Sequence, residues 1–337
     1  MRTRRALVWA AGGLLAVLCC SGVAASPVEG ADRIVTSDAG LNLDAFLGTF
    51  AWDANAGLSF SNSGPGPDRL VLFSHGHARL APVAPWRLGD QPFPSLAPDG
   101  NGAPVAAYPR CTRFDCDLFE LSVRSGREHK LRSLSSRRWS EQAVAVWGRH
   151  YLFSRPFCPH PARTCPGTGL FVSPPLRRVA DAPVRSFDLR GPVVAFTAVR
   201  SPNVTSDTDT VVTAYLTGRP RPRQCVVADA RQLRAHGLRH ASVVLNPSLT
   251  RRFVYWIAGP DGSAEETGPH FALRRRIPTR RCRQRGPIEK LRTVPSDTWI
   301  DRIAVTGGRV FYTVPYSDFA GLKVALREMT DPPVHDP

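Results

Sequence analysis

The sequence lacks every short motif that would point to a common catalytic site. It contains no G-x-S-x-G, no H-E-x-x-H, no Walker loop, no G-x-G-x-x-G and no EF-hand loop. These patterns mark serine hydrolases, zinc proteases, nucleotide-binding enzymes and calcium sites, so the sequence offers no support for those classes. The S-x-D-x-G-x-T-W repeat typical of sialidases is missing too. We therefore predict no catalytic residue, no cofactor and no metal site.

Long apolar runs and amphipathic helices are also scarce. The only extended apolar run is Ala6–Cys20, which at 15 residues is shorter than the roughly 20 needed to span a bilayer. The best helical candidate is the short segment Ala230–His240. We therefore expect no transmembrane segment and an almost entirely β-stranded protein.

The N-terminus has the three parts of a secretory signal peptide. Basic residues lead into the apolar run, and Val23–Ala25 supplies small residues for cleavage before Ser26. We predict a signal peptide over residues 1–25 and a bacterial protein that is extracellular or attached to the cell envelope. Thr3–Leu7 loosely resembles a twin-arginine signal, and Leu18–Cys20 is a poor lipobox. The export route and a lipid anchor therefore stay open.

Positive charge exceeds negative charge by a wide margin. The chain has 44 Lys and Arg against 28 Asp and Glu, for a net charge of +16. The arginines are spread through every segment, which is typical of a GC-rich genome, although a basic surface also favours anionic polymers. Because aromatics are not interleaved with these arginines as in a stacking platform, we do not expect nucleic-acid binding.

Six cysteines remain after the signal peptide, an even number that predicts disulfides in an exported chain. Two pairs are close enough in sequence to close a hairpin loop, and the third pairs by elimination. No pair has C-x2-C spacing, which argues against a zinc site. The predicted bridges are Cys111–Cys116, Cys158–Cys165 and Cys225–Cys282. The last would join the fourth strands of neighbouring repeats; elimination favours it, but the separation of blades at the rim opposes it, so it stays open.

An internal repeat organises the rest of the chain. The pattern W-x-[DE]-x6-G-R begins at Trp139 and again at Trp299, 160 residues later, or about three periods of 53. Short β-branched and aromatic runs recur between turns rich in Gly, Pro, Asn and Asp, as in strands. The clearest runs are 104–108, 151–154, 193–197, 253–257 and 310–314.

Six such units fit between about residues 33 and 330. In the first unit we expect strands over 46–52, 57–60, 69–74 and 77–83. Repeats of 40 to 60 residues with four strands each are typical of propellers. We predict one domain over 26–337, an all-β, six-bladed β-propeller of four-stranded antiparallel blades, with 33–36 added to the last blade. Seven blades, or a pair of β-sandwiches, are the alternatives.

Two stretches carry a family resemblance. Residues 102–111 and 116–128 resemble blades of TolB-like, WD-repeat-like propellers, and the chain is most similar to exported propeller proteins of actinobacteria. The resemblance covers most of the mature chain and is most specific over 95–155 and 299–315. It implies a propeller that serves as a binding platform, and it transfers no catalytic residue.

The best candidates for ligand contact come from propeller geometry. The first strand of each blade lines the central channel and starts at one mouth, and Glu141 and Asp301 occupy that start in units three and six, which face each other in a six-bladed ring. Trp139 and Trp299, two residues earlier, would form an apolar lip. The structural alternative is that the two acids cap strand ends by binding backbone amides or arginines.

These observations favour a non-catalytic exported binding module. We expect a monomer that holds an unknown protein or an envelope glycan. The alternative is a propeller hydrolase or lactonase with a metal at the channel mouth, which requires several acids around one centre.

Overall fold

The computed structural model describes most of the chain beyond the predicted signal peptide. The described residues are 32–37, 39, 42–53, 68–86, 93–112, 115–135, 140–155, 167–181, 184–199, 209–216, 221–238, 241, 243–260, 268–296, 299–318 and 321–330. The signal peptide over 1–25, Trp139, and the predicted Cys158–Cys165 bridge lie outside them. Among these residues, no helix is long and apolar enough to cross a membrane.

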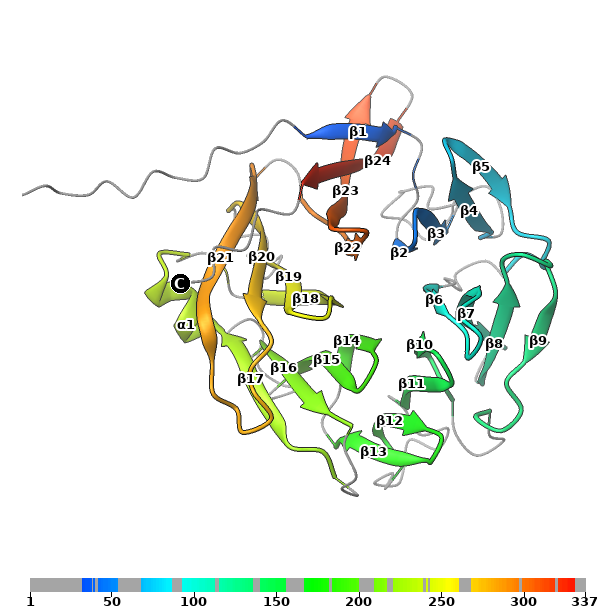
Figure 1. Ribbon diagram of the computed structural model, residues 1–337. Helices are drawn as coiled ribbons and strands as arrows, with labels where there is room; N and C mark the ends of the chain where they lie inside the picture. The colour runs from blue at the N-terminus through cyan, green and yellow to red at the C-terminus, as the bar shows by residue number, and fades with distance from the viewer. Residues whose placement is uncertain are drawn as a thin grey trace, which may run out of the picture.

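Six four-stranded antiparallel sheets are arranged radially in a ring, which confirms the six-bladed propeller (Figure 1). We number the blades I to VI along the chain. Blade I consists of β2 (Asp44–Phe46), β3 (Thr49–Asp53), β4 (Leu70–Ser74) and β5 (His77–Leu80). Blade II consists of β6 (Ser95–Pro98), β7 (Pro104–Cys111), β8 (Cys116–Ser122) and β9 (Glu128–Lys130). Blade III consists of β10 (Ala143–Trp147), β11 (His150–Arg155), β12 (Gly169–Ser173) and β13 (Arg177–Ala180).

The second half of the ring repeats this order. Blade IV consists of β14 (Val184–Arg190), β15 (Val193–Val199), β16 (Asp209–Tyr215) and β17 (Gln224–Asp229). The helix α1 (Ala230–Ala235) follows it, within the segment predicted to be helical. Blade V consists of β18 (Val243–Leu249), β19 (Phe253–Gly259), β20 (His270–Arg276) and β21 (Arg285–Val294). Blade VI consists of β22 (Ile303–Thr306), β23 (Arg309–Asp318), β24 (Gly321–Thr330) and β1 (Arg33–Thr36).

Blade VI closes the ring with strands from both ends of the described chain. The N-terminal strand β1 pairs antiparallel with β24, with Arg33 opposite Glu328 and Thr36 opposite Leu326. This arrangement confirms the predicted strand exchange and leaves β1 as the outermost strand of the last blade (Figure 1).

The second strand of each blade carries one large aromatic side chain that is almost inaccessible to water. Burying an aromatic between neighbouring sheets removes a large apolar area from solvent and gives each blade the same anchor. The five predicted second strands are all confirmed, as β7, β11, β15, β19 and β23. The six aromatics are Trp52, Tyr108, Phe153, Phe196, Trp256 and Tyr312.

The first blade differs from its prediction in one place. Residues 46–52 were expected to form one strand, but Leu47 and Gly48 form the turn between β2 and β3. Both residues have positive φ, 48° and 76°. A two-residue hairpin turn with this twist normally has the sequence Asn-Gly or Asp-Gly. Because Leu47 replaces the usual Asn or Asp, the turn could not be recognised from the sequence. The strand expected over 57–60 lies outside the described residues.

Two of the predicted disulfides lie within the described residues. Cys111 and Cys116 face each other across the loop between β7 and β8, as predicted, with an S–S distance of 2.04 Å. Cys225 and Cys282 are also bonded, with an S–S distance of 2.07 Å and a Cα–Cα distance of 5.0 Å. Both bridges are compatible with an exported protein.

The second bridge does not join two equivalent positions, which corrects the expectation that both cysteines belong to fourth strands. Cys225 lies in β17 of blade IV, but Cys282 lies in the loop before β21 of blade V. This loop extends alongside β17, where the side-chain amide of Gln284 donates to the carbonyl of Val226. The separation of the two blades at the rim is therefore bridged by a loop and not by two strands.

Candidate functional site

The first strand of every blade has one residue at an equivalent position beside the central channel. In each blade this residue is the register partner of the second-strand residue that immediately precedes the buried aromatic. We call these six residues the channel ring, and in blade order they are Asp44, Ser95, Ala145, Asp188, Ser248 and Ala304. The order Asp-Ser-Ala repeats twice, so like residues lie three blades apart, on opposite sides of the axis.

A second ring lies two residues earlier, at the mouth of the channel. We call it the mouth ring, and it consists of Asn42, Phe93, Ala143, Ser186, Asn246 and Arg302. All six residues line a cavity of about 280 Å³, which the four polar members of the channel ring also line. Because every blade contributes to its wall, the cavity exists only when the ring is closed.

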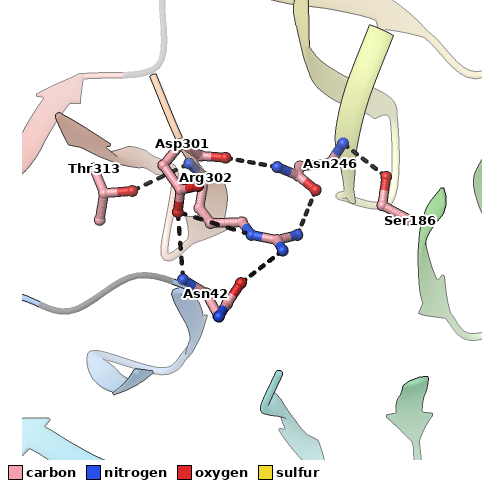
Figure 2. A network of polar contacts seen from close by, with 6 residues as sticks. All are labelled: Asn42, Ser186, Asn246, Asp301, Arg302 and Thr313. Atoms are coloured by element: carbon pink, nitrogen blue, oxygen red, sulfur yellow. Dashed lines mark hydrogen bonds and ion pairs between the residues drawn. The ribbon is translucent and has the colours of Figure 1, made fainter. Parts of the chain in front are cut away.

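Arg302 is the centre of a polar network that ties four blades together (Figure 2). Its guanidinium donates to the amide oxygen of Asn42 at 2.8 Å and to that of Asn246. The backbone N–H of Asn246 donates to Ser186 Oγ at 2.8 Å. Asp301 accepts from the backbone N–H of Asn42 at 3.3 Å and lies 3.9 Å from Arg302 Nε. The network fixes the shape of the mouth before any ligand arrives.

Three mouth-ring residues have backbones in the left-handed region. Their φ values are 55° for Asn42, 36° for Phe93 and 51° for Asn246. Asparagine tolerates this conformation, whereas a bulky phenylalanine there is strained by roughly 1–3 kcal/mol. Such strain tends to cluster at binding sites, and Phe93 is also an exposed aromatic, with 38% of its surface accessible. Its ring lies 5.7 Å from the Arg302 guanidinium carbon.

Asp44 and Asp188 form the floor of the cavity. Each carboxylate accepts a backbone N–H from the next blade, Asp44 from Leu96 at 2.7 Å and Asp188 from Leu249 at 2.6 Å. Desolvation in the channel, followed by repulsion from Asp188, raises the pKa of Asp44 to about 7. Desolvation also raises the pKa of Asp188. No lysine or arginine is among the groups that act on Asp44.

Beyond this floor the channel narrows to a space of about 20 Å³. Phe46 and Trp147, from blades I and III, meet edge to face with ring centroids 6.0 Å apart. The guanidinium of Arg190 lies 4.6 Å from the Trp147 ring centroid and donates to the carbonyl of Leu249. A ligand of the mouth cavity therefore enters and leaves from the mouth side.

The structure separates the two acids that the repeat had placed in equivalent positions. Gln142 N donates to Ser154 O and Asp301 N donates to Thr313 O, so the equivalent of Asp301 is Gln142 and not Glu141. The gapless repeat is one residue out of register because the β10–β11 turn is Gly148-Arg149, whereas the β22–β23 turn is Gly307-Gly308. A shift of one residue turns a strand side chain to the opposite face.

Neither acid is among the described residues that line the cavity. Glu141 is fully buried and forms an ion pair with Arg155 at 3.0 Å, as its structural alternative proposed. Asp301 supports Arg302 and Asn42 from behind the cavity wall. Trp299 is half-buried beside this segment. The residues that do line the mouth, Gln142 and Arg302, each follow a predicted one.

Comparisons with known proteins find distant similarities. No protein-family model and no curated protein sequence matches the chain. Among solved structures it is similar to TolB from Acinetobacter baumannii, with 12% identity, a TM-score of 0.49, and coverage of 84% of this chain and 64% of that one. The β-propeller domain of the Trilobed protease from Pyrococcus furiosus is 9% identical, with a TM-score of 0.45 and coverage of 89% and 97%.

A Pyrococcus horikoshii acylaminoacyl peptidase is also similar, with 9% identity, a TM-score of 0.43, and coverage of 87% of this chain and 46% of that one. The chain thus spans less than two thirds of the TolB structure and less than half of the peptidase. The neighbours include both TolB and peptidases, so the site has to be interpreted from its own residues.

Proposed function

We propose that the chain is an exported binding module without catalytic activity of its own, and that its mouth cavity receives a cationic group of a protein partner. The observation that carries this proposal is the pair Asp44 and Asp188 on the floor of a cavity walled by all six blades. A pair of carboxylates in a desolvated site is costly when both are ionised. A cation placed between them removes that cost.

The chemistry of the wall favours a lysine or arginine side chain over an envelope glycan. Such a side chain has an apolar stem and a charged end. The cavity offers Phe93 at its mouth and the carboxylates at its floor. Arg190 already offsets part of the charge of Asp188, but a neutral sugar would leave Asp44 without a counter-charge. We therefore favour a protein partner that inserts one basic side chain.

Binding of a cation is coupled to loss of a proton. Because the pKa of Asp44 is about 7 in the free protein, its carboxyl group is largely protonated at pH 5. A bound ammonium or guanidinium group stabilises the ionised carboxylate and expels the proton. Affinity should therefore rise with pH, by up to about tenfold per pH unit below 7.

The alternative function, a metal-dependent hydrolase or lactonase, makes a different demand. It needs three or more ligands around one centre. Within the described part of the chain, no three His, Cys, Asp or Glu side chains are grouped closely enough to hold a metal. Elemental analysis of the purified protein separates the two proposals, since a stoichiometric tightly held metal would favour the enzyme.

Calorimetry with single-residue probes tests the binding proposal. Nα-acetyl-lysine-amide and Nα-acetyl-arginine-amide should bind, more tightly at pH 8 than at pH 5, whereas Nα-acetyl-norleucine-amide, which lacks the charged group, should not. Replacing Asp44→Ser and Asp188→Ser copies the serines at the same ring position in blades II and V, so the fold should persist while binding is lost. Equal binding of norleucine-amide, or unchanged binding by the double variant, would contradict the proposal.

Export is tested separately. Fractionation of cells that produce the full chain should place it outside the cytoplasm. Sequencing of the exported protein should begin at Ser26, the predicted first residue after cleavage. A protein that keeps residues 1–25 in the cytoplasm would contradict export while leaving the cavity proposal intact.

A further inference from the structure

A second pocket lies at the other end of blade V from the mouth cavity. It has a volume of about 250 Å³, and four of its lining residues are arginines. We call it the rim pocket, and its lining residues are Tyr215, Arg251, Arg252, Arg276, Ile277 and Arg285. Like charges repel, so four arginines would not be expected to gather in one concave site unless the fold held them there.

Strand geometry forces these arginines together. Arg251 and Arg252 form the turn between β18 and β19, and Arg276 ends β20. Arg276 lies directly opposite Arg285 in the β20–β21 register. Like charges in directly opposite positions of an antiparallel pair are destabilising. The fold therefore keeps an unfavourable arrangement at this place.

Among the described residues, acidic side chains do not neutralise the exposed arginines of this pocket. Seven of the twelve residues from 274 to 285 are arginines. The nearby carboxylate of Glu289 is engaged by Arg274, at 2.8 Å and 2.6 Å. Within the described residues, no carboxylate pairs with Arg251, Arg252 or Arg285, and all three are exposed to solvent.

The loop between β20 and β21, which connects Arg276 to Arg285, is firmly attached to blade IV. The Cys225–Cys282 bridge joins it to β17. Tyr215 closes one side of the pocket, because its hydroxyl donates to the carbonyl of Pro278 at 2.7 Å. The guanidinium carbon of Arg280 lies 5.7 Å from the centroid of the Tyr215 ring. The pocket is thus preorganised, and a ligand need not collect flexible arginines from the surface.

We propose that the rim pocket binds the phosphate group of a polyanion. Guanidinium groups bind phosphate oxygens through paired hydrogen bonds, and several together neutralise its full charge. The phosphate could belong to a soluble polymer or to a lipid headgroup, and both present the same tetrahedral anion. This site is separate from the mouth cavity and does not depend on the function proposed for it.

The test uses the purified protein, a short linear polyphosphate, and vesicles of phosphatidylglycerol with phosphatidylcholine. The test variant carries Arg251→Ala and Arg285→Ala. The control carries Arg124→Ala and Arg127→Ala, two exposed arginines in the turn between β8 and β9 of blade II. Both variants lose the same charge, so only the rim pocket distinguishes them.

We expect polyphosphate affinity to fall by about tenfold or more in the test variant and to change by less than about threefold in the control. The slope of log affinity against log salt should decrease by about one to two, as expected for two lost phosphate contacts. Vesicle binding that is lost in the same variant would identify a lipid source, and binding of polyphosphate alone would identify a soluble polymer. Equal losses in both variants, or no binding by the unaltered protein to either probe, would overturn the proposal.

Discussion

The mouth cavity and the rim pocket both contain arginine, but in opposite circumstances. At the mouth, Arg302 is held by two asparagines and an aspartate, and it ties blades together. At the rim, Arg251 and Arg285 have no carboxylate partner within the described residues. This contrast indicates that the interaction partners of an arginine, more than its solvent exposure, show whether it stabilises the fold or is available to bind a ligand.

The largest expected effect concerns the bridge that attaches the rim pocket to blade IV. Replacing Cys225 and Cys282 by serine opens a loop with a sequence separation of 57 residues. In the chain-entropy model this lowers the free energy of unfolding by roughly 4 kcal/mol. The matched pair Cys111 and Cys116 spans only five residues, so its removal should cost about 2 kcal/mol. Urea denaturation of the two variants measures both values, and equal losses would contradict the model.

The second prediction addresses pH at the channel floor. Because the folded-state pKa of Asp44 is raised to about 7, the folded protein retains a proton that the unfolded chain releases near pH 4. The resulting stability is complete below pH 4 and is lost as the pH rises to 7. The loss should be about 2–4 kcal/mol, since water in the channel reduces the effect.

The variant Asp44→Asn isolates this contribution, because its side chain is neutral at every pH. The free energy of unfolding of each protein is measured from pH 4 to pH 8. It should fall with rising pH more steeply for the unaltered chain than for the variant. If the two free energies of unfolding changed in parallel with pH, the Asp44 carboxylate would be ionised in the folded protein across this range. The mouth cavity would then lack the protonated carboxyl group that sets it apart from the rim pocket.

The third prediction removes the mouth arginine. Arg302→Ala leaves the amide oxygens of Asn42 and Asn246 without their donor and should cost about 1–3 kcal/mol. Arg302→Lys should recover little of this, because an ammonium group cannot donate to both amides with the geometry of a guanidinium. Thermal unfolding monitored by circular dichroism measures the difference, and full recovery by lysine would show that charge alone matters there.

The smallest effect should have the opposite sign. Arg285→Ala relieves the repulsion with Arg276 across β20 and β21, and Arg251→Ala removes a further positive charge from the pocket, so stability should stay constant or rise by up to about 0.5 kcal/mol. A loss above about 1 kcal/mol would show that the rim arginines support the fold as Arg302 does. That result would end the contrast between the two regions.

The fold could be predicted from sequence because each blade needs the same apolar strand, and that strand repeats visibly. The ring closure by residues 33–36 followed from the same reasoning. The site was harder to predict, because a register error of one residue suffices to select Glu141 instead of a cavity-lining neighbour. Counting back from the aromatic of each second strand would have located the channel ring, but that requires the exact turn length of every hairpin, and Leu47-Gly48 shows how a turn can escape recognition.

Because blade VI combines β1 with β24, it can be completed only after both ends of the described chain have been synthesised. Strand β1 is synthesised first, yet its partner β24 is the last strand of the described chain to emerge. Five blades can therefore assemble in order while β1 waits without a partner, and only then is the circle sealed by a strand of four residues. A chain halted before β24 would carry an unpaired edge on β23, a ready template for association with another copy. The same short strand that completes the molecule thus also sets the moment at which it ceases to be prone to aggregation.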